Sequence, residues 1–263
     1  VMPRRVRQVR PWLGGGWDNV EIAARRSKIG KSKFANPMQV RIQVPASTSN
    51  LGSGFDTLGL AVRLYNRLDV RRWVGKAISP AWKLSEEDRR WFQQALAAAG
   101  ELFFRTTGAR RFGAEVELRG DVPVARGLGA SATVRVGLLA ALNELSAAHV
   151  DREMLLSMAT ELEGHPDNAS PAIFGGFTVS GRVAGAVRCS SFRVESRRKL
   201  VTLMPAFGTS TEAARQLMPA TYGKEDAAHA LNRAAMITAA MAGRNYGNLR
   251  GLFDDRIHQP YRE

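Results

Sequence analysis

The glycine-rich stretch ARGLGASATVRVG, residues 125–137, joins a loop to the start of a helical pattern. Apolar residues recur from Val134 at Leu138, Leu142 and Leu145, which is the spacing of one helix stripe. Glycines let a backbone turn with its N–H groups inward, and a helix N-terminus adds unpaired N–H donors and the positive end of the helix dipole. The stretch could therefore cradle a phosphate or another anion. A tight turn ahead of a buried helix is the alternative from these residues alone.

Two further polar clusters could hold a small ligand. SNLGSGFD places Asn50 and Asp56 around two glycines, although such residues also form ordinary turns. EGHPDN, residues 163–168, gathers four polar side chains beside an apolar segment, where each unmatched buried polar group would cost about 1 to 3 kcal/mol. His165 has no second histidine or cysteine at metal-ligand spacing, so zinc is not expected. Glu163 together with phosphate oxygens would instead suit magnesium.

A third cluster is cationic. Arg215 lies one helical turn from Thr211 and so on the same face, and DRIHQPYR near the end of the sequence contains His258 and Arg262. Surface arginines are usually solvated. These two would matter for function only if an anionic partner, such as a carboxylate, lies beside them.

Charge and composition limit the classes of protein that fit. The formal net charge is +14, but residues 1–37 hold nine basic and two acidic residues, so seven of the fourteen excess charges lie there. This distribution weakens a nucleic-acid interpretation, and the triple glycine in the segment predicts disorder. IGKSK is not a Walker loop, because Arg25 stands where that motif needs glycine. With the single cysteine Cys189 and no apolar run of about 18 residues, we expect a soluble cytoplasmic protein without disulfides.

The elements that must position these clusters follow from periodicity. Alternation predicts strands at residues 40–44, ended by Pro45, and at residues 114–120. Apolar runs predict one or two strands within residues 58–70 and strands at residues 177–180 and 200–204. Helical composition spans residues 85–104. Strands mixed with helices, without strict alternation, indicate an α+β fold.

Two further helices are predicted from capping signals. Asp151 can cap a helix whose buried face carries Met154, Leu155, Met158 and Leu162, and Pro166 is expected to stop it. A capping box of Thr209 and Glu212 predicts a helix that Pro219 closes.

Four segments in this order and spacing resemble the signature segments of the homoserine kinase family of the GHMP small-molecule kinases: PASTSNLGSGFDTLGLAVRLYN, PVARGLGASA, EGHPDNASPAIFGGF and HQPYR. The resemblance begins near Met38. It implies a two-domain fold, with an N-terminal domain like domain 2 of ribosomal protein S5 and a ferredoxin-like C-terminal domain. We accordingly expect a basic, disordered extension over residues 1–37, an ATP-binding domain over residues 38–198 and an incomplete C-terminal domain over residues 199–263.

The resemblance implies ATP- and Mg²⁺-dependent phosphorylation of the L-homoserine hydroxyl to O-phospho-L-homoserine, a step of threonine biosynthesis. The residues implied at the nucleotide loop are Pro123, Arg126, Gly127, Leu128, Gly129, Ala130, Ser131 and Ala132. Ser131 and Glu163 are the implied magnesium ligands, and Glu161 is close enough in sequence to compete. The residues implied around homoserine are Asn50, Asp56, His165, Thr211 and Arg262.

The same resemblance implies catalytic roles for Asn168 and Arg215. Arg215 and Arg262 match the pair that grips the substrate carboxylate, and Asn168 stands where other superfamily members have an aspartate base, so no strong base is assigned. Ala130 departs from the usual loop serine, and the family's third, glycine-rich motif would lie beyond Glu263. We therefore expect this chain to be truncated and slower than a longer one.

Two alternatives stay open. One is a kinase of the same fold that acts on a mevalonate-type or sugar-type alcohol, and the other is a noncatalytic protein that binds anions or nucleic acid. The preferred hypothesis has a small-molecule substrate, no nucleic-acid or membrane partner, and a homodimer as the candidate assembly.

Overall fold

The computed structural model describes residues 5–9, 21–25, 39–81, 86–195, 197–204 and 211–262. Within these residues, seven strands form one mixed sheet and two form a small antiparallel sheet. The predicted α+β class is confirmed. The proposed domain boundaries at residues 37 and 198 stay predictions.

The long strand β4 (Gly54–Trp73) organises the large sheet. It pairs antiparallel with β3 (Gln39–Asn50) along nearly its whole length and with β6 (Gly113–Gly120) along its second half. Its first half pairs with β7 (Phe177–Val183), which continues into β8 (Ala186–Phe192). The apolar run at residues 58–70 is therefore one strand.

Strand β3 runs further than its sequence predicts. Val40, Ile42 and Val44 are fully buried, as the alternation requires, but the strand does not end at Pro45. The pairing register with β4 shifts between Pro45 and Ala46. Such a bulge accommodates a residue without an N–H group, so the strand continues into the first polar cluster.

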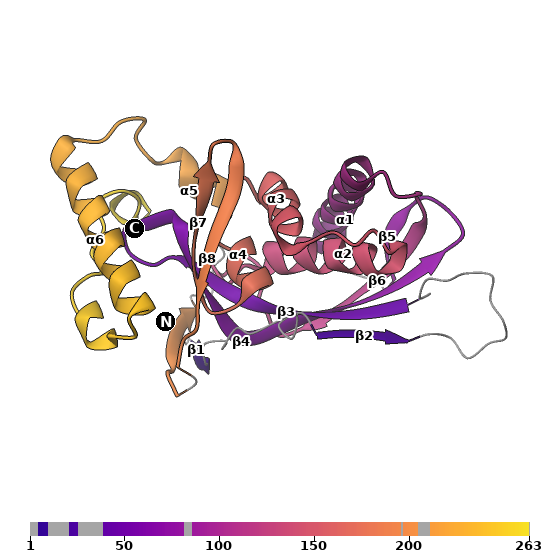
Figure 1. Cartoon of the computed structure of the whole chain (residues 1–263), viewed down its shortest axis with the longest axis horizontal. Coiled ribbons are helices and arrows are strands. Elements are labelled where there is room, and N and C mark those ends of the chain that lie inside the picture. The colour runs from indigo at the N-terminus through magenta and orange to yellow at the C-terminus, as the bar shows by residue number, and fades with distance from the viewer. Residues whose placement is uncertain are drawn as a thin grey trace.

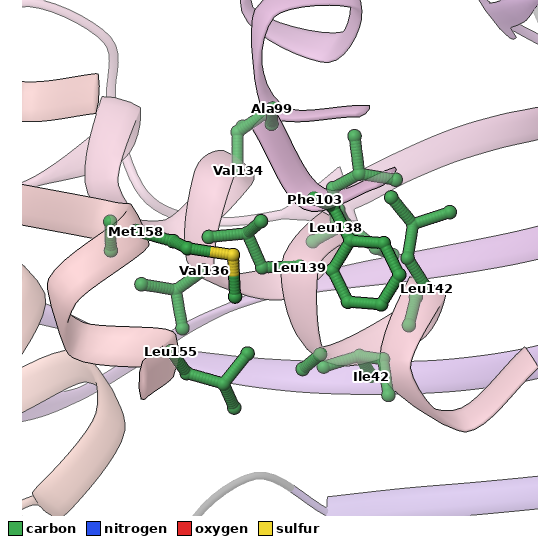
Figure 2. Close-up of a cluster of buried hydrophobic side chains, with 14 of the residues drawn as sticks. Ile42, Ala99, Phe103, Val134, Val136, Leu138, Leu139, Leu142, Leu155 and Met158 are labelled. Atoms are coloured by element: carbon green, nitrogen blue, oxygen red, sulfur yellow. The ribbon is translucent and has the colours of Figure 1, made fainter. Parts of the chain in front are cut away.

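Four helices cover one face of this sheet (Figure 1). They are α1 (Glu86–Thr107), α2 (Ala130–Ser146), α3 (Arg152–Glu163) and the short α4 (Ala169–Phe174). Figure 2 shows the apolar core between them and the sheet, where Phe103, Leu138 and Leu142 lie close to Ile42 of β3. The helices predicted at residues 85–104 and from Val134 are thus confirmed.

Helix α3 begins as predicted and ends earlier than predicted, and of its predicted face Leu155, Met158 and Leu162 belong to the core whereas Met154 does not. The Asp151 carboxylate accepts the N–H of Met154 at 2.8 Å, so the predicted cap is present. The helix ends at Gly164, whose left-handed backbone (φ 85°) closes it before Pro166. The buried arc is centred on Leu155, Leu156 and Ala159, and Met154 lies at its edge, 45% exposed.

The remaining elements lie at the other end of the molecule in Figure 1. They are β9 (Leu200–Met204), α5 (Thr211–Gln216), α6 (Lys224–Ala242) and two short 3₁₀ helices, Tyr246–Leu249 and Gln259–Tyr261. Ile237 and Met241 of α6 pack on Leu58 and Leu60 of β4. Thr209, the predicted cap of α5, lies outside the described residues. No helix in the described ranges is both long and apolar enough to cross a membrane.

Two segments of residues 1–37, a region for which composition predicts disorder, form strands. β1 (Arg5–Val9) pairs antiparallel with β9, and β2 (Glu21–Arg25) pairs antiparallel with Gln39–Gln43 of β3. Composition alone favoured disorder, but the edge of a sheet offers unpaired N–H and C=O groups to any extended segment. The short strand β5 (Ile78–Pro80), parallel to β6, closes the opposite edge of the large sheet.

Candidate active site

The glycine-rich loop lies where β3 meets the N-terminus of α2. Gly127 and Gly129 have left-handed backbones, with φ of 68° and 65°, and Gly129 is the N-cap of α2. Leu128 is buried with Ala46, and its carbonyl accepts the N–H of Ser47 at 3.2 Å. The loop is therefore anchored on β3. Among the described residues no side chain caps the start of α2, so this N-terminus suits an anion.

Gly129 touches the second polar cluster directly. A Cβ atom at this position would lie 2.9 Å from Oδ1 of Asn168 and closer still to Oγ of Ser47. Ser47 Oγ donates to Oδ1 of Asn168 at 2.9 Å, and the amide nitrogen of Asn168 donates to Ser49 Oγ at 3.0 Å. Both ends of the Asn168 amide are thus fixed beside the glycine-rich loop. The two serines have no motif of their own beyond the polar run STSN, and the sequence analysis did not assign them to the site.

The structure separates the two candidate glutamates at the end of α3. The Ser131 hydroxyl donates to Oε1 of Glu163 at 2.8 Å, and Arg135 Nη1 lies 2.7 Å from the same oxygen. Glu161 instead pairs with Arg105 at 2.9 Å, and its side chain is 59% exposed. A hydroxyl and a carboxylate side by side are the hard oxygen donors that Mg²⁺ binds, so Ser131 and Glu163 fit that ion.

The loop residues Pro123 to Ala132 differ in their burial. Leu128, Ala130 and Ala132 are buried beneath the loop, whereas Pro123, Arg126, Gly127 and Ser131 lie nearer its surface. Arg126 bonds the neighbouring carbonyl of Ala125 through Nη1 at 3.1 Å. The loop therefore offers an anion its backbone together with the partly exposed side chains of Arg126 and Ser131.

An acidic group and an arginine pair at the other end of this region. Arg215 of α5 makes a bidentate ion pair with Asp56 of β4, with Nη1 to Oδ2 at 3.0 Å. Asn50 Oδ1 accepts the backbone N–H of Asp56 at 3.0 Å and so holds the turn. Asn50 therefore has the turn role that its sequence context also allowed. Thr211 opens α5, and its side chain lies outside the described part of the chain.

His165 and Asp167 stand beside this ion pair. His165 Nδ1 donates to Asp167 Oδ1, and Asp167 is buried. Burial alone would lower the pKa of His165, but the hydrogen bond and charge of Asp167 outweigh it and raise the pKa above its ordinary value. Asp167 belongs to the EGHPDN cluster, but its sequence context did not predict a role in the site.

Asp56, His165 and Asp167 each offer one ligand atom, and these atoms lie within 4.8 Å of one another. They are a group that could also hold a cation, which the sequence spacing did not suggest. Asp56 is already paired with Arg215, so the group carries its own counterion. An ammonium group, which needs oxygen acceptors rather than a fixed metal geometry, suits this surrounding equally well.

Aromatic contacts bring the two predicted arginines together. The Cζ atoms of Arg215 and Arg262 lie 5.0 and 5.2 Å from the centre of the same ring, that of Phe55. Burial and the charge of Arg215 lower the pKa of Arg262. The two arginines predicted to bind a carboxylate therefore come from segments that are distant in the sequence. Phe55 lies inside the quoted motif GFD, but its type gave no functional signal.

Comparison with known proteins gives three findings. The profile of the family described as "GHMP kinases N terminal domain" matches residues 93–176. A curated homoserine kinase of Clostridium kluyveri is 35% identical over 228 residues, which are 86% of this chain and 75% of that protein. One from Clostridium acetobutylicum is 33% identical over 85% of this chain and 76% of its own length.

Solved structures show the same fold. A homoserine kinase from Cytophaga hutchinsonii superposes with a TM-score of 0.72 at 21% identity, over 90% of this chain and 76% of that one. A mevalonate kinase from Methanococcus jannaschii superposes with a TM-score of 0.54 at 11% identity, over 81% of this chain and 78% of that one. The fold is therefore shared with kinases for more than one kind of alcohol.

Proposed function

Because the chain belongs to the homoserine kinase family of the GHMP kinases, we propose that its site transfers the γ-phosphoryl group of ATP to the side-chain hydroxyl of L-homoserine. The products are ADP and O-phospho-L-homoserine, and the reaction belongs to threonine biosynthesis. One observation carries the assignment of roles. The glycine-rich loop, which would bind the phosphates, meets the homoserine-binding part of the site at Asn168, and Gly129 and Ser47 lie against Asn168.

The two sides of the site have different tasks. The backbone of residues 127–131 and the N-terminus of α2 bind the triphosphate, and Ser131 and Glu163 hold magnesium. Magnesium, when bound, offsets the negative charge of the phosphates. Asn168, fixed by its two serine contacts, orients the acceptor hydroxyl. We assign no strong base, because phosphoryl transfer depends mostly on positioning and charge stabilisation.

Homoserine is recognised as a zwitterion. In the structure Asp56 and Arg215 neutralise each other, so a bound amino acid replaces both halves of that ion pair. Its ammonium group lies against Asp56, and its carboxylate is held by Arg215 and Arg262. A guanidinium is suited to this because its planar fork matches a carboxylate with two parallel hydrogen bonds.

The test is an ADP-release assay on the purified chain with ATP, Mg²⁺ and one alcohol at a time. We expect kcat/KM for L-homoserine to exceed that for mevalonate or galactose by at least about 100-fold, because a site built for charged groups rejects substrates that leave them unpaired. Phosphorus NMR identifies the product. Faster turnover of mevalonate would favour the sister-kinase alternative, and ATP binding without any turnover would favour a noncatalytic protein.

A further inference from the structure

Phe55, to which the proposed mechanism assigns no role, lies at the centre of an aromatic and cationic cluster. It is the second residue of β4, between Gly54 and Asp56, and its side chain is half-buried. Its ring stacks on the imidazole of His258, with centroids 5.3 Å apart and an interplanar angle of 30°. Arg215 and Arg262 both approach the same ring.

His258 fixes the orientation of this ring. The imidazole is 5% exposed, and its Nε2 donates to the carbonyl of Gly52 at 2.8 Å. Its backbone N–H donates to Oδ2 of the buried Asp255 at 2.7 Å. The stacked pair thus ties the turn before β4 to residues near the end of the sequence. Phe55 is a rigid platform rather than a loose surface ring.

The two arginines depend on the platform to different degrees. Arg215 also has Asp56 as a bidentate partner. The polar partner of Arg262 is weaker: its Nη2 donates to Sδ of Met218 at 3.5 Å. No described residue accepts a hydrogen bond from its buried Nε. Two guanidinium groups repel each other, and the electron-rich face of a ring attracts both. The ring therefore holds together two like charges that a carboxylate will later bridge.

We propose that Phe55 is a positioning residue that sets specificity for a substrate carboxylate, by holding Arg215 and Arg262 ready on one ring. The inference rests on the proposed function, because homoserine supplies that carboxylate. The role of Phe55 goes beyond the proposed function because it predicts a selective effect. Loss of the aromatic face impairs recognition of the carboxylate and leaves phosphoryl transfer itself intact.

The test compares Phe55→Leu, which keeps apolar bulk without the aromatic face, with Phe55→Tyr, which keeps the face. For Phe55→Leu we expect the KM for homoserine to rise about tenfold, with kcat and the KM for ATP within about twofold of the original. Homoserine amide, whose carboxylate is replaced by a neutral carboxamide, should lose much less. Phe55→Tyr should restore the original KM for homoserine.

Phe192→Leu is the matched control, because Phe192 is a half-buried ring on β8 that packs against Phe177, a member of a different cluster from the two arginines. It should leave both KM values unchanged. Three outcomes would each overturn the proposal. They are an equal rise in KM for homoserine and its amide, an unchanged KM for homoserine in Phe55→Leu, and a KM for homoserine that Phe55→Tyr does not restore. If the unmodified chain does not turn over homoserine, the proposed function fails instead, whatever the variants do.

Discussion

Arg215 is the side chain that links the ligand-free ion pair to the proposed substrate contact. Arg215→Ala removes one of the two arginines that bind the carboxylate. We expect kcat/KM for homoserine to fall by a factor that corresponds to a loss of about 2 to 4 kcal/mol of transition-state binding free energy. The KM for ATP should stay the same. Steady-state kinetics with each substrate varied measure both, and the exposed Arg188→Ala is the control. Normal turnover by Arg215→Ala would show that the carboxylate lies elsewhere.

Glu163 and Glu161 form a matched pair on one helix. Glu163 contacts Ser131 beside the phosphate loop, whereas Glu161 pairs with Arg105 at the surface. Glu163→Gln should raise the Mg²⁺ concentration for half-maximal activity at least about tenfold, because a charged ligand is lost. Glu161→Gln should not. Titration of activity with Mg²⁺ distinguishes them, and the opposite ranking would exclude Glu163 as the ligand.

At the scale of elements, the junction of the glycine loop with α2 admits only glycine at position 129. Gly129→Ala adds backbone strain at φ 65° and a clash with Ser47 and Asn168. We expect it to lower the free energy of unfolding by about 2 to 4 kcal/mol and to weaken ATP binding.

Gly185→Ala separates the two costs in that experiment. Gly185 lies in the turn between β7 and β8 with φ 81°, and a Cβ there would meet nothing within 4 Å. Gly185→Ala should therefore be destabilised by backbone strain alone, by about 1 kcal/mol. Urea unfolding of both variants gives the difference, and equal losses would mean that the contact with Ser47 and Asn168 is not tight.

The segment around the second 3₁₀ helix depends on one carboxylate. Burial would raise the pKa of Asp255, but backbone N–H groups of Gln259, His258 and Ile257 outweigh it and lower the pKa below its ordinary value. A lowered pKa stabilises the fold above the unfolded-state pKa of about 4, and this stability is lost as pH falls through the folded value.

Asp255→Asn should therefore lower the melting temperature at neutral pH, by an amount that corresponds to about 1 to 3 kcal/mol. The gap between the two proteins should shrink as pH falls below about 4. Melting curves from neutral to acidic pH measure it. The control is Asp226→Asn, an acid that pairs with Arg256 at the surface. A gap that is constant with pH would rule out the carboxylate charge as its cause.

At the level of the whole molecule, residues 1–37 contribute charge and two described strands, β1 and β2. Their removal takes the net charge from +14 to +7, since they carry seven of the fourteen excess charges. The buried Val40, Ile42 and Val44 belong to the core cluster that α2 covers, so we expect the melting temperature to fall by only a few degrees. Homoserine turnover should not change. Calorimetry of the shortened chain tests this, and a fall of more than about 10 °C would show that the segment supports the core.

The local elements and the identity of the chemical groups could be predicted from the amino-acid sequence. The stripe from Val134 to Leu145 predicted α2, and Asp151 predicted the start of α3, because periodicity and caps act over a few residues. Linked motifs were enough to indicate the family. Local signals failed where neighbours in space intervene, as when a register shift carried β3 past Pro45, β9 paired with β1 and the edge of the large sheet paired with β2.

Only the tertiary structure decided which groups meet. Asp56 and Arg215 are 159 residues apart in sequence, and Ser47 and Asn168 are 121 apart. Glu161 lies close enough to Glu163 in sequence to compete with it as a ligand, and the rotation of α3 against α2 brought Glu163, not Glu161, to Ser131. The same packing brought Phe55 beneath both arginines. Such contacts depend on how whole elements pack, and no short stretch of sequence encodes that geometry.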